Sequence, residues 1–348
     1  MEPSPDRRAR QLADRAETRP EAVTVAVVLD LLGHRDPAVL RPTISALDAV
    51  VSVRPAEFVP AIPGLIDVVR RPDDPCREGA LTTLTRFAVH VPEEVAPYAD
   101  VLAAATEGTD PRERTAAMGC LAAIAPADPG ALIEVDAVPI FVGAITDSAA
   151  VRRGALLALG AIAESDPDVV APHAPLLVAV FDPDERPPAE RNDRAHAATA
   201  LGRIAGVDPD AVLPAVEPAV EALDSTSGPI RTNATAMMAD LADRRPAEIQ
   251  PYTDRFASLL SDDHAGTRSN ATSALARIAA TFPETVSPAI PALRECLSDE
   301  RSKARENACL ALGYCAESTV ADDLRVMRDR DPDPGVRERA AWALARIE

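Results

Sequence analysis

A proline recurs along the chain at a nearly constant spacing, and this regularity limits the folds available to it. Seven prolines follow one another at intervals of 37, 37, 38, 42, 37 and 37 residues: Pro55, Pro92, Pro129, Pro167, Pro209, Pro246 and Pro283. An arginine stands fifteen residues before six of these prolines, and two further arginines continue the series. We call this series the arginine column: Arg77, Arg114, Arg152, Arg194, Arg231, Arg268, Arg305 and Arg337. Such a period is typical of repeat proteins, in which each unit packs only on its neighbours.

Apolar residues keep a fixed register to the arginine column. An alanine stands three residues after each arginine, and a large apolar residue stands seven after it: Leu84, Leu121, Leu159, Leu201, Met238, Leu275, Leu312 and Leu344. At about 100° per residue these positions fall on one stripe, which predicts an amphipathic helix. Asp or Asp-Pro precedes the stripe, as at Asp110, and suits a helix N-cap. We call this the second helix of each hairpin.

The segment after each closing proline predicts the first helix of the next hairpin. A further proline usually stands five residues on, and proline fits the first turn of a helix because its missing N–H would be unpaired there. Apolar runs such as residues 176–181 follow. The repeating unit is therefore a helix, a short turn with Asp, a second helix and a proline loop.

The pattern D-x-x-x-x-R-x-x-A-x-x-x-L-x-x-I-A, clearest at residues 147–163 and 263–279, resembles the HEAT-repeat family of armadillo-like helical proteins. It is most similar to the short hairpins of phycobilin-lyase-like and archaeal HEAT proteins. The resemblance implies an all-α fold, a right-handed α-α superhelix or HEAT-repeat solenoid of about nine helical hairpins, whose second helices line the concave side. It says little about activity, because the motif residues are structural.

The repeats predict one continuous solenoid over residues 1–348. Residues 1–36 form an N-terminal cap with the first helices, including a polar helix at 5–17. Residues 37–317 are regular repeats with an inserted turn at 182–191, and residues 318–348 are a shortened C-terminal repeat.

The amino-acid composition indicates the solvent conditions in which the protein works more than it indicates a binding partner. The formal charge is −19 and Lys303 is the only lysine, so the chain resembles proteins of halophilic archaea. This charge makes nucleic-acid binding unlikely, and high salt would weaken it further. The chain shows no apolar signal segment and no run long enough to span a membrane. Its five cysteines form no CxxC pair, so we expect buried thiols in the cytoplasm.

The stripe opposite the core is the candidate partner-binding surface. Asn233, Asn270 and Asn307 succeed one another in it, each in the sequence Arg-x-Asn-Ala. Such a column could hydrogen-bond an extended peptide, as a similar column does in armadillo repeats, although the tryptophans that accompany it there are missing. The alternatives are capping of the first helical turn and recent duplication of repeats.

Other side chains of the same stripe complete the candidate site. Arginines here could hold an acidic peptide or phosphates, or simply be solvated. The residues proposed to contact a protein or peptide ligand on the concave face are His196, Arg203, Asn233, Asn270, Arg277, Asn307 and Tyr314. We expect a scaffold or adaptor that is not an enzyme and has no catalytic residue, metal or cofactor.

The arginine column lies in phase with the core leucines, and a charge there needs a partner. Acidic residues stand three to six positions upstream of most of these arginines: Asp74, Asp110, Asp147, Asp263, Asp299 and Asp333. We expect an Asp–Arg ladder that ties neighbouring hairpins together.

Two further functions stay open. Small residues such as Gly119, Gly154 and Gly160 would let a ligand approach the backbone, as in an accessory lyase-like or cofactor-handling protein. Nucleic-acid binding through Arg86, Arg203 and Arg277 is less favoured. No histidine precedes a glutamate, as the iron sites of HEAT-fold hydroxylases require, and there is no Gly-Lys pair for a phosphate-binding loop.

Overall fold

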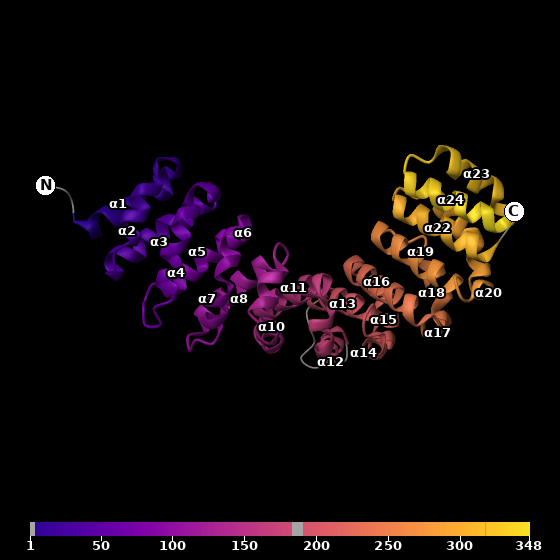
Figure 1. Ribbon diagram of the computed structural model, residues 1–348, viewed down its shortest axis with the longest axis horizontal. Coiled ribbons are helices and arrows are strands. Elements are labelled where there is room, and N and C mark those ends of the chain that lie inside the picture. The colour runs from indigo at the N-terminus through magenta and orange to yellow at the C-terminus, as the bar shows by residue number, and fades with distance from the viewer. Residues whose placement is uncertain (1–3, 183–190, 317) are drawn as a thin grey trace. The chain divides into compact units, whose positions relative to one another are not determined.

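The computed structural model describes residues 4–182, 191–316 and 318–348, and within these ranges every regular element is a helix (Figure 1). The chain divides into two compact units, residues 1–169 and 170–348, which are described separately. Nine helical hairpins lie within the described residues, which confirms the all-α fold and the number of hairpins.

Unit 1 contains an N-terminal helix and four hairpins. The N-terminal helix is α1 (Pro5–Thr18). The first helices of the hairpins are α2 (Val25–Leu32), α4 (Ile62–Val69), α7 (Ala99–Thr106) and α10 (Val138–Ala144). The second helices are α3 (Pro37–Val51), α5 (Arg77–His90), α8 (Pro111–Ile124) and α11 (Ala149–Ser165).

Unit 2 contains five hairpins. Their first helices are α12 (Ala174–Phe181), α15 (Val216–Ala222), α18 (Thr253–Leu259), α21 (Ile290–Glu295) and α23 (Ala321–Arg330). Their second helices are α13 (Arg191–Ala205), α16 (Gly228–Arg244), α19 (Ala265–Ala279), α22 (Ser302–Cys315) and α24 (Pro334–Ile347).

Short helical pieces lead into most first helices. Those with α geometry are α6 (Pro92–Val95), α9 (Pro129–Glu134), α14 (Pro209–Val212), α17 (Pro246–Ile249) and α20 (Pro283–Val286). Those with 3-10 geometry are η1 (Pro20–Ala22), η2 (Pro55–Ala61), η3 (Ala96–Tyr98), η4 (Pro167–Val169), η5 (Ala171–His173), η6 (Leu213–Ala215), η7 (Gln250–Tyr252), η8 (Ser287–Ala289) and η10 (Ser318–Val320). One more 3-10 turn, η9 (Cys296–Ser298), follows the first helix α21.

The proline five residues after each closing proline does not open a single helix as predicted. Pro97, Pro214, Pro251 and Pro288 lie in the 3-10 turns, between a four-residue helix and the main first helix. Proline lacks an N–H and its ring crowds the preceding turn, so the chain tightens to 3-10 geometry there. The first half of each hairpin is therefore a bent sequence of short helices.

Each unit has two layers with the core between them. Every first helix packs on the second helix of its own hairpin. The second helices pack side by side in each unit, and α1 packs beside α3 in the same row: α3, α5, α8 and α11 in unit 1, and α13, α16, α19, α22 and α24 in unit 2 (Figure 1). The large apolar residues seven positions after each arginine are all buried, between 0% and 3% exposed. The predicted core stripe is therefore confirmed.

The predicted helix starts are confirmed at several hairpins. The carboxylates of Asp36, Asp110 and Asp333 accept hydrogen bonds from the amide two residues on, at the first turns of α3, α8 and α24. These bonds satisfy amides that have no partner inside the helix.

Helix α1 lies at the start of unit 1, and α24 lies at the end of unit 2. Helix α1 buries Ala9, Leu12 and Ala16 and exposes most of its charged residues, as a capping helix should. Residues 183–190 of the predicted inserted turn, and residue 317 at the end of the regular repeats, lie outside the described residues. Among the helices that are described, none is both long and apolar enough to cross a membrane.

Candidate interaction surface

The predicted asparagine column lies on the second helices of unit 2, but its amides bind the neighbouring helix. The Nδ2 atoms of Asn233, Asn270 and Asn307 donate to the main-chain carbonyls of Ala195, Thr232 and Ser269, at 2.8, 2.9 and 3.4 Å. Each acceptor lies 38 residues earlier, on the preceding second helix. Asn307 is also buried. The column therefore joins successive hairpins.

The other predicted site residues of unit 2 also have partners within the fold. Arg277 donates to Asp240 on the preceding second helix at 2.8 Å. Tyr314 packs edge-to-face on Trp342, with ring centroids 4.9 Å apart, and Arg346 lies over both rings. His196 and Arg203 have interactions of their own. The structure thus brings the predicted site residues together on four adjacent second helices, α13, α16, α19 and α22.

The arginine column forms a ladder, but with a different pairing from the predicted one. In unit 2 the Nε atoms of Arg231, Arg268 and Arg305 donate to carboxylates of the next hairpin, on Asp262, Asp299 and Asp331, at 2.7, 2.6 and 2.8 Å. The Nη1 atoms of Arg268, Arg305 and Arg337 donate to the main-chain carbonyls of the same three aspartates. Each aspartate therefore joins two successive arginines. Asp299 was among the acids expected from sequence, whereas Asp262 and Asp331 were not.

The ladder carboxylates are nearly enclosed, with side chains between 3% and 7% exposed. Burial by itself raises the pKa of Asp299, but hydrogen bonds from Arg268 and from the amide of Arg301 outweigh it, so the pKa lies below the ordinary 3.8. The same balance lowers the pKa of Asp262 and Asp331. These aspartates are therefore ionised structural partners of the arginines.

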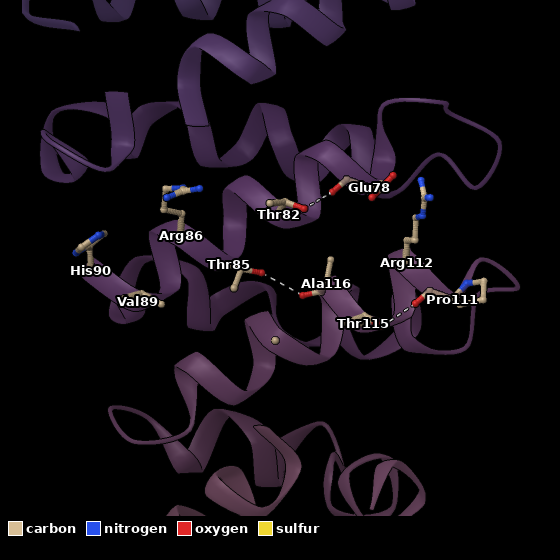
Figure 2. A pocket seen from close by; sticks show the side chains of 11 residues that line it. Glu78, Thr82, Thr85, Arg86, Val89, His90, Pro111, Arg112, Thr115 and Ala116 are labelled. Carbon is tan, nitrogen blue, oxygen red and sulfur yellow. Dashed lines mark hydrogen bonds between the residues drawn. The ribbon is translucent and has the colours of Figure 1, made fainter. Parts of the chain in front are cut away.

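In unit 1 a groove runs between the second helices α5 and α8, with a volume of about 750 Å³ (Figure 2). Arg86 and His90 stand at one end of it, and Glu78 and Arg112 stand at the other. Threonines, Ala116 and Gly119 line the length between them. Both walls are second helices, so the groove opens on the face that the sequence predicted for binding.

The threonines of the groove use their hydroxyl protons within the helices. Thr82 donates to the carbonyl of Glu78 at 2.9 Å, and Thr115 donates to the carbonyl of Pro111 at 2.8 Å (Figure 2). The hydroxyl of Thr85 contacts the carbonyl of Ala116 on the opposite helix at 3.1 Å. Between its charged ends the groove therefore presents mainly methyl groups and backbone.

Two further grooves continue along the same face of unit 1. One of about 290 Å³ lies between α3 and α5 and shares Glu78 and Thr82 with the first. Another of about 530 Å³ lies between α1 and α3 and shares Arg41 and Ser45 with the second. Shared walls make the three into one surface, which we call the unit 1 groove surface.

The glycines suggested from sequence as a ligand site have different surroundings. Gly119 lines the groove between α5 and α8. Gly154 lies against α8, where a Cβ atom would come within 3.3 Å of the Cβ of Ala122. A small residue at Gly154 is therefore explained by the close packing of two helices.

The described cysteines and acidic residues fit a structural role. The five cysteines are present as thiols, and Cys315 is partly exposed whereas the other four are buried. Among the residues that the structure describes, no group of three or more His, Cys, Asp or Glu side chains could hold a metal ion.

Sequence patterns did not reveal the unit 1 groove surface. Arg86 and Gly119 were noticed separately, but a groove depends on the spacing between α5 and α8, which a helical wheel of one helix does not contain. A usable signal was the run of short side chains at Thr82, Thr85 and Ala116, next to long charged ones.

Comparison with known proteins supports this class of fold. The family described as HEAT repeats matches residues 290–348, and the family described as HEAT-like repeat matches residues 265–314. The crystal structure of an engineered protein is similar to the chain with a TM-score of 0.82 and 22% identity, covering 97% of this chain and 94% of the other. It is one of 462 similar solved chains, so the fold alone does not indicate a function. No curated protein matches in sequence.

Residues 265–348 are therefore similar to HEAT repeats, and the chain has the all-α fold of a helical-repeat solenoid. HEAT repeats and a helical repeat fold suit a scaffold or interaction role in general.

Proposed function

We propose that the protein is a scaffold or adaptor that holds an extended segment of another protein on the unit 1 groove surface. The observation that carries this proposal is the continuity of three grooves across the N-terminal helix α1 and the second helices α3, α5 and α8. A ligand in such a surface gains affinity from many small contacts along its length.

The surfaces of the two units differ in a way that favours unit 1. Four of the predicted binding residues of unit 2 join successive hairpins through hydrogen bonds: Asn233, Asn270, Arg277 and Asn307. In the unit 1 groove surface, the guanidinium groups of Arg41 and Arg112 make no ion pair or hydrogen bond with any described residue. Both side chains belong to exposed residues and are available to a ligand.

We further propose that this role involves no catalysis. The groove is open to solvent, and its threonine hydroxyls donate to main-chain carbonyls, so no neighbouring base draws their protons. A cytoplasmic location, adaptation to high salt and a kinship with archaeal or phycobilin-lyase-like HEAT proteins belong to the same proposal. The acidic composition and the short hairpins support them.

The test is selection of binding peptides from a random library on the full chain, followed by affinity measurements on two variants. Thr82 is exposed and lines two of the grooves, so Thr82→Trp should obstruct both. Ser273 has the same register on α19, five residues after Arg268, and Ser273→Trp is the matched control in unit 2.

We expect Thr82→Trp to weaken the selected peptides at least tenfold while the circular dichroism melting curve is unchanged. Ser273→Trp should leave their affinity within twofold. Peptides that lose affinity only with Ser273→Trp would overturn the placement in unit 1 and favour the asparagine face. Failure to select any peptide would overturn the proposed function itself.

A further inference from the structure

We propose that the segment held on the unit 1 groove surface is acidic, with carboxylates that contact Arg41 and Arg112 and a small aliphatic side chain that covers the groove floor. This inference rests on the proposed function and adds the chemical class of the ligand. It follows from the distribution of charge along the surface and from the hydrogen bonding of its floor.

The unit 1 groove surface differs in charge from the rest of the chain. Four arginines and two carboxylates line its three grooves: Arg10, Arg41, Arg86, Arg112, Asp48 and Glu78. The chain as a whole carries a formal charge of −19. A basic strip inside a strongly acidic protein attracts an acidic ligand locally, while the remaining surface repels it from other positions.

The charged groups of the strip are not equivalent. Arg86 forms a two-point pair with Asp48, with Nε–Oδ1 and Nη2–Oδ2 distances of 2.8 and 3.0 Å, so both charges are already matched. Arg10 lies 3.6 Å from Asp6. Arg41 and Arg112 therefore provide the unmatched positive charge, one on α3 and the other on α8.

The floor of the groove between α5 and α8 determines which ligand side chain fits between the carboxylates of the ligand. The hydroxyls of Thr82 and Thr115 are committed to carbonyls of their own helices, so the groove offers few donors to a polar ligand there. Val89 is 64% exposed at the groove wall and adds apolar area. A small aliphatic side chain would cover this area and gain free energy by removing it from water.

Glu78 supplies a test within the surface itself. It stands at the same end of the groove as Arg112, and its carboxylate makes no ion pair with any described residue (Figure 2). An acidic ligand must approach this negative charge. Removing the charge of Glu78 and reversing the charge of Arg112 should therefore change affinity in opposite directions, which a general loss of folding could not do.

The experiment uses the full chain and fluorescence anisotropy. The probe is a labelled peptide of sequence Gly-Glu-Glu-Val-Glu-Glu-Gly, compared with the same peptide carrying Gln for Glu and with a single-stranded oligonucleotide. The variants are Arg41→Glu, Arg112→Glu and Glu78→Gln. Arg301→Glu is the matched control, because Arg301 is exposed, lies in unit 2 and changes the total charge equally.

We expect Arg41→Glu and Arg112→Glu each to raise the Kd of the acidic peptide about three- to tenfold. Glu78→Gln should lower it about twofold, and Arg301→Glu should leave it unchanged. The differences should shrink as salt rises, because ions screen charges beyond about 10 Å at 0.1 M.

Three results would overturn the inference. The first is an acidic peptide that binds no more tightly than its Gln counterpart. The second is tighter binding of the oligonucleotide with the same response to the variants, which would indicate nucleic acid. The third is an equal effect of Arg301→Glu. If peptides from the random library still lose affinity with Thr82→Trp, the proposed function would survive each of these results.

Discussion

Arg268 on α19 donates from Nε to the carboxylate of Asp299 at a distance of 2.6 Å, across the boundary between two hairpins. The arginine side chain is 17% exposed and the aspartate side chain 5%. The pair thus joins one repeat to the next in a place that water scarcely reaches. Removing one member would leave the other charge without its partner in this site, which is costly.

Replacing Asp299 with Asn should lower the free energy of unfolding by about 2–3 kcal/mol at pH 7. Asp210→Asn is the control, since Asp210 pairs with Arg245 but is 67% exposed, and this pair should contribute little. Urea unfolding followed by circular dichroism measures both. Equal effects of the two variants would show that burial of the ladder pair does not increase its contribution to stability.

The contribution of the ladder should depend on pH in one direction. The pKa of Asp299 is lowered in the folded protein, so its stabilisation is complete above the ordinary value of 3.8 and is lost as pH falls through the folded value. The difference in stability between the wild type and Asp299→Asn should therefore stay constant from pH 7 to about pH 4 and decrease below it. A difference that increases on acidification would be inconsistent with the lowered pKa.

Replacing Asn233, Asn270 and Asn307 with Ala should destabilise unit 2. Each substitution removes a hydrogen bond to the neighbouring second helix, which should lower the free energy of unfolding by about 1 kcal/mol. Single variants and the triple variant can be compared by urea unfolding. Unchanged stability with weaker peptide binding would instead assign the column to ligand recognition.

Two glycine substitutions should have opposite effects. A Cβ atom at Gly313 on α22 would come within 2.8 Å of the Cα and Cβ atoms of Ala343 on α24, so Gly313→Ala should cost about 1–3 kcal/mol. The same substitution at Gly143 meets no atom within 4 Å, and the higher helix propensity of alanine should stabilise by up to about 1 kcal/mol. Thermal melts of the two variants check this pair, and a stabilised Gly313→Ala would contradict the close approach of the helices.

Alkylation should distinguish Cys315 from the other cysteines. Burial raises the pKa of the Cys120 thiol to about 12 and that of Cys296 to about 11, so neither forms thiolate at pH 8. Iodoacetamide followed by mass spectrometry should modify Cys315 first in the native protein and all five cysteines after unfolding. Early modification of Cys120 would indicate local opening of α8.

The hairpins could be predicted from sequence because their signal is local. The positions of Leu84 and Leu275 relative to Arg77 and Arg268 repeat within single helices, and a helical wheel converts them into a buried stripe. The closing prolines likewise act through their own backbone. Features of this kind need no knowledge of how hairpins stack.

The partners across hairpins could not be predicted in the same way. Asn270 lies well away from the core stripe on its own helix, so the wheel placed it on open surface. It is the neighbouring helix that supplies the carbonyl of Thr232. The arginine column was likewise paired with upstream acids of its own hairpin, whereas Arg231 binds Asp262 of the next hairpin. The unit 1 groove surface was missed for the same reason.

The double use of each ladder aspartate has a consequence for how such an array can change its length. In each of the three pairs the arginine stands six positions after the aspartate: Asp262 and Arg268, Asp299 and Arg305, and Asp331 and Arg337. Excision of residues 263–299 would place Arg305 six positions after Asp262. Asp262 could then bind Arg231 through its carboxylate and Arg305 through its main-chain carbonyl, so the ladder would stay complete. The array can therefore gain or lose whole hairpins and keep its ladder. Insertion or deletion of part of a hairpin would instead leave an arginine out of reach of its carboxylate.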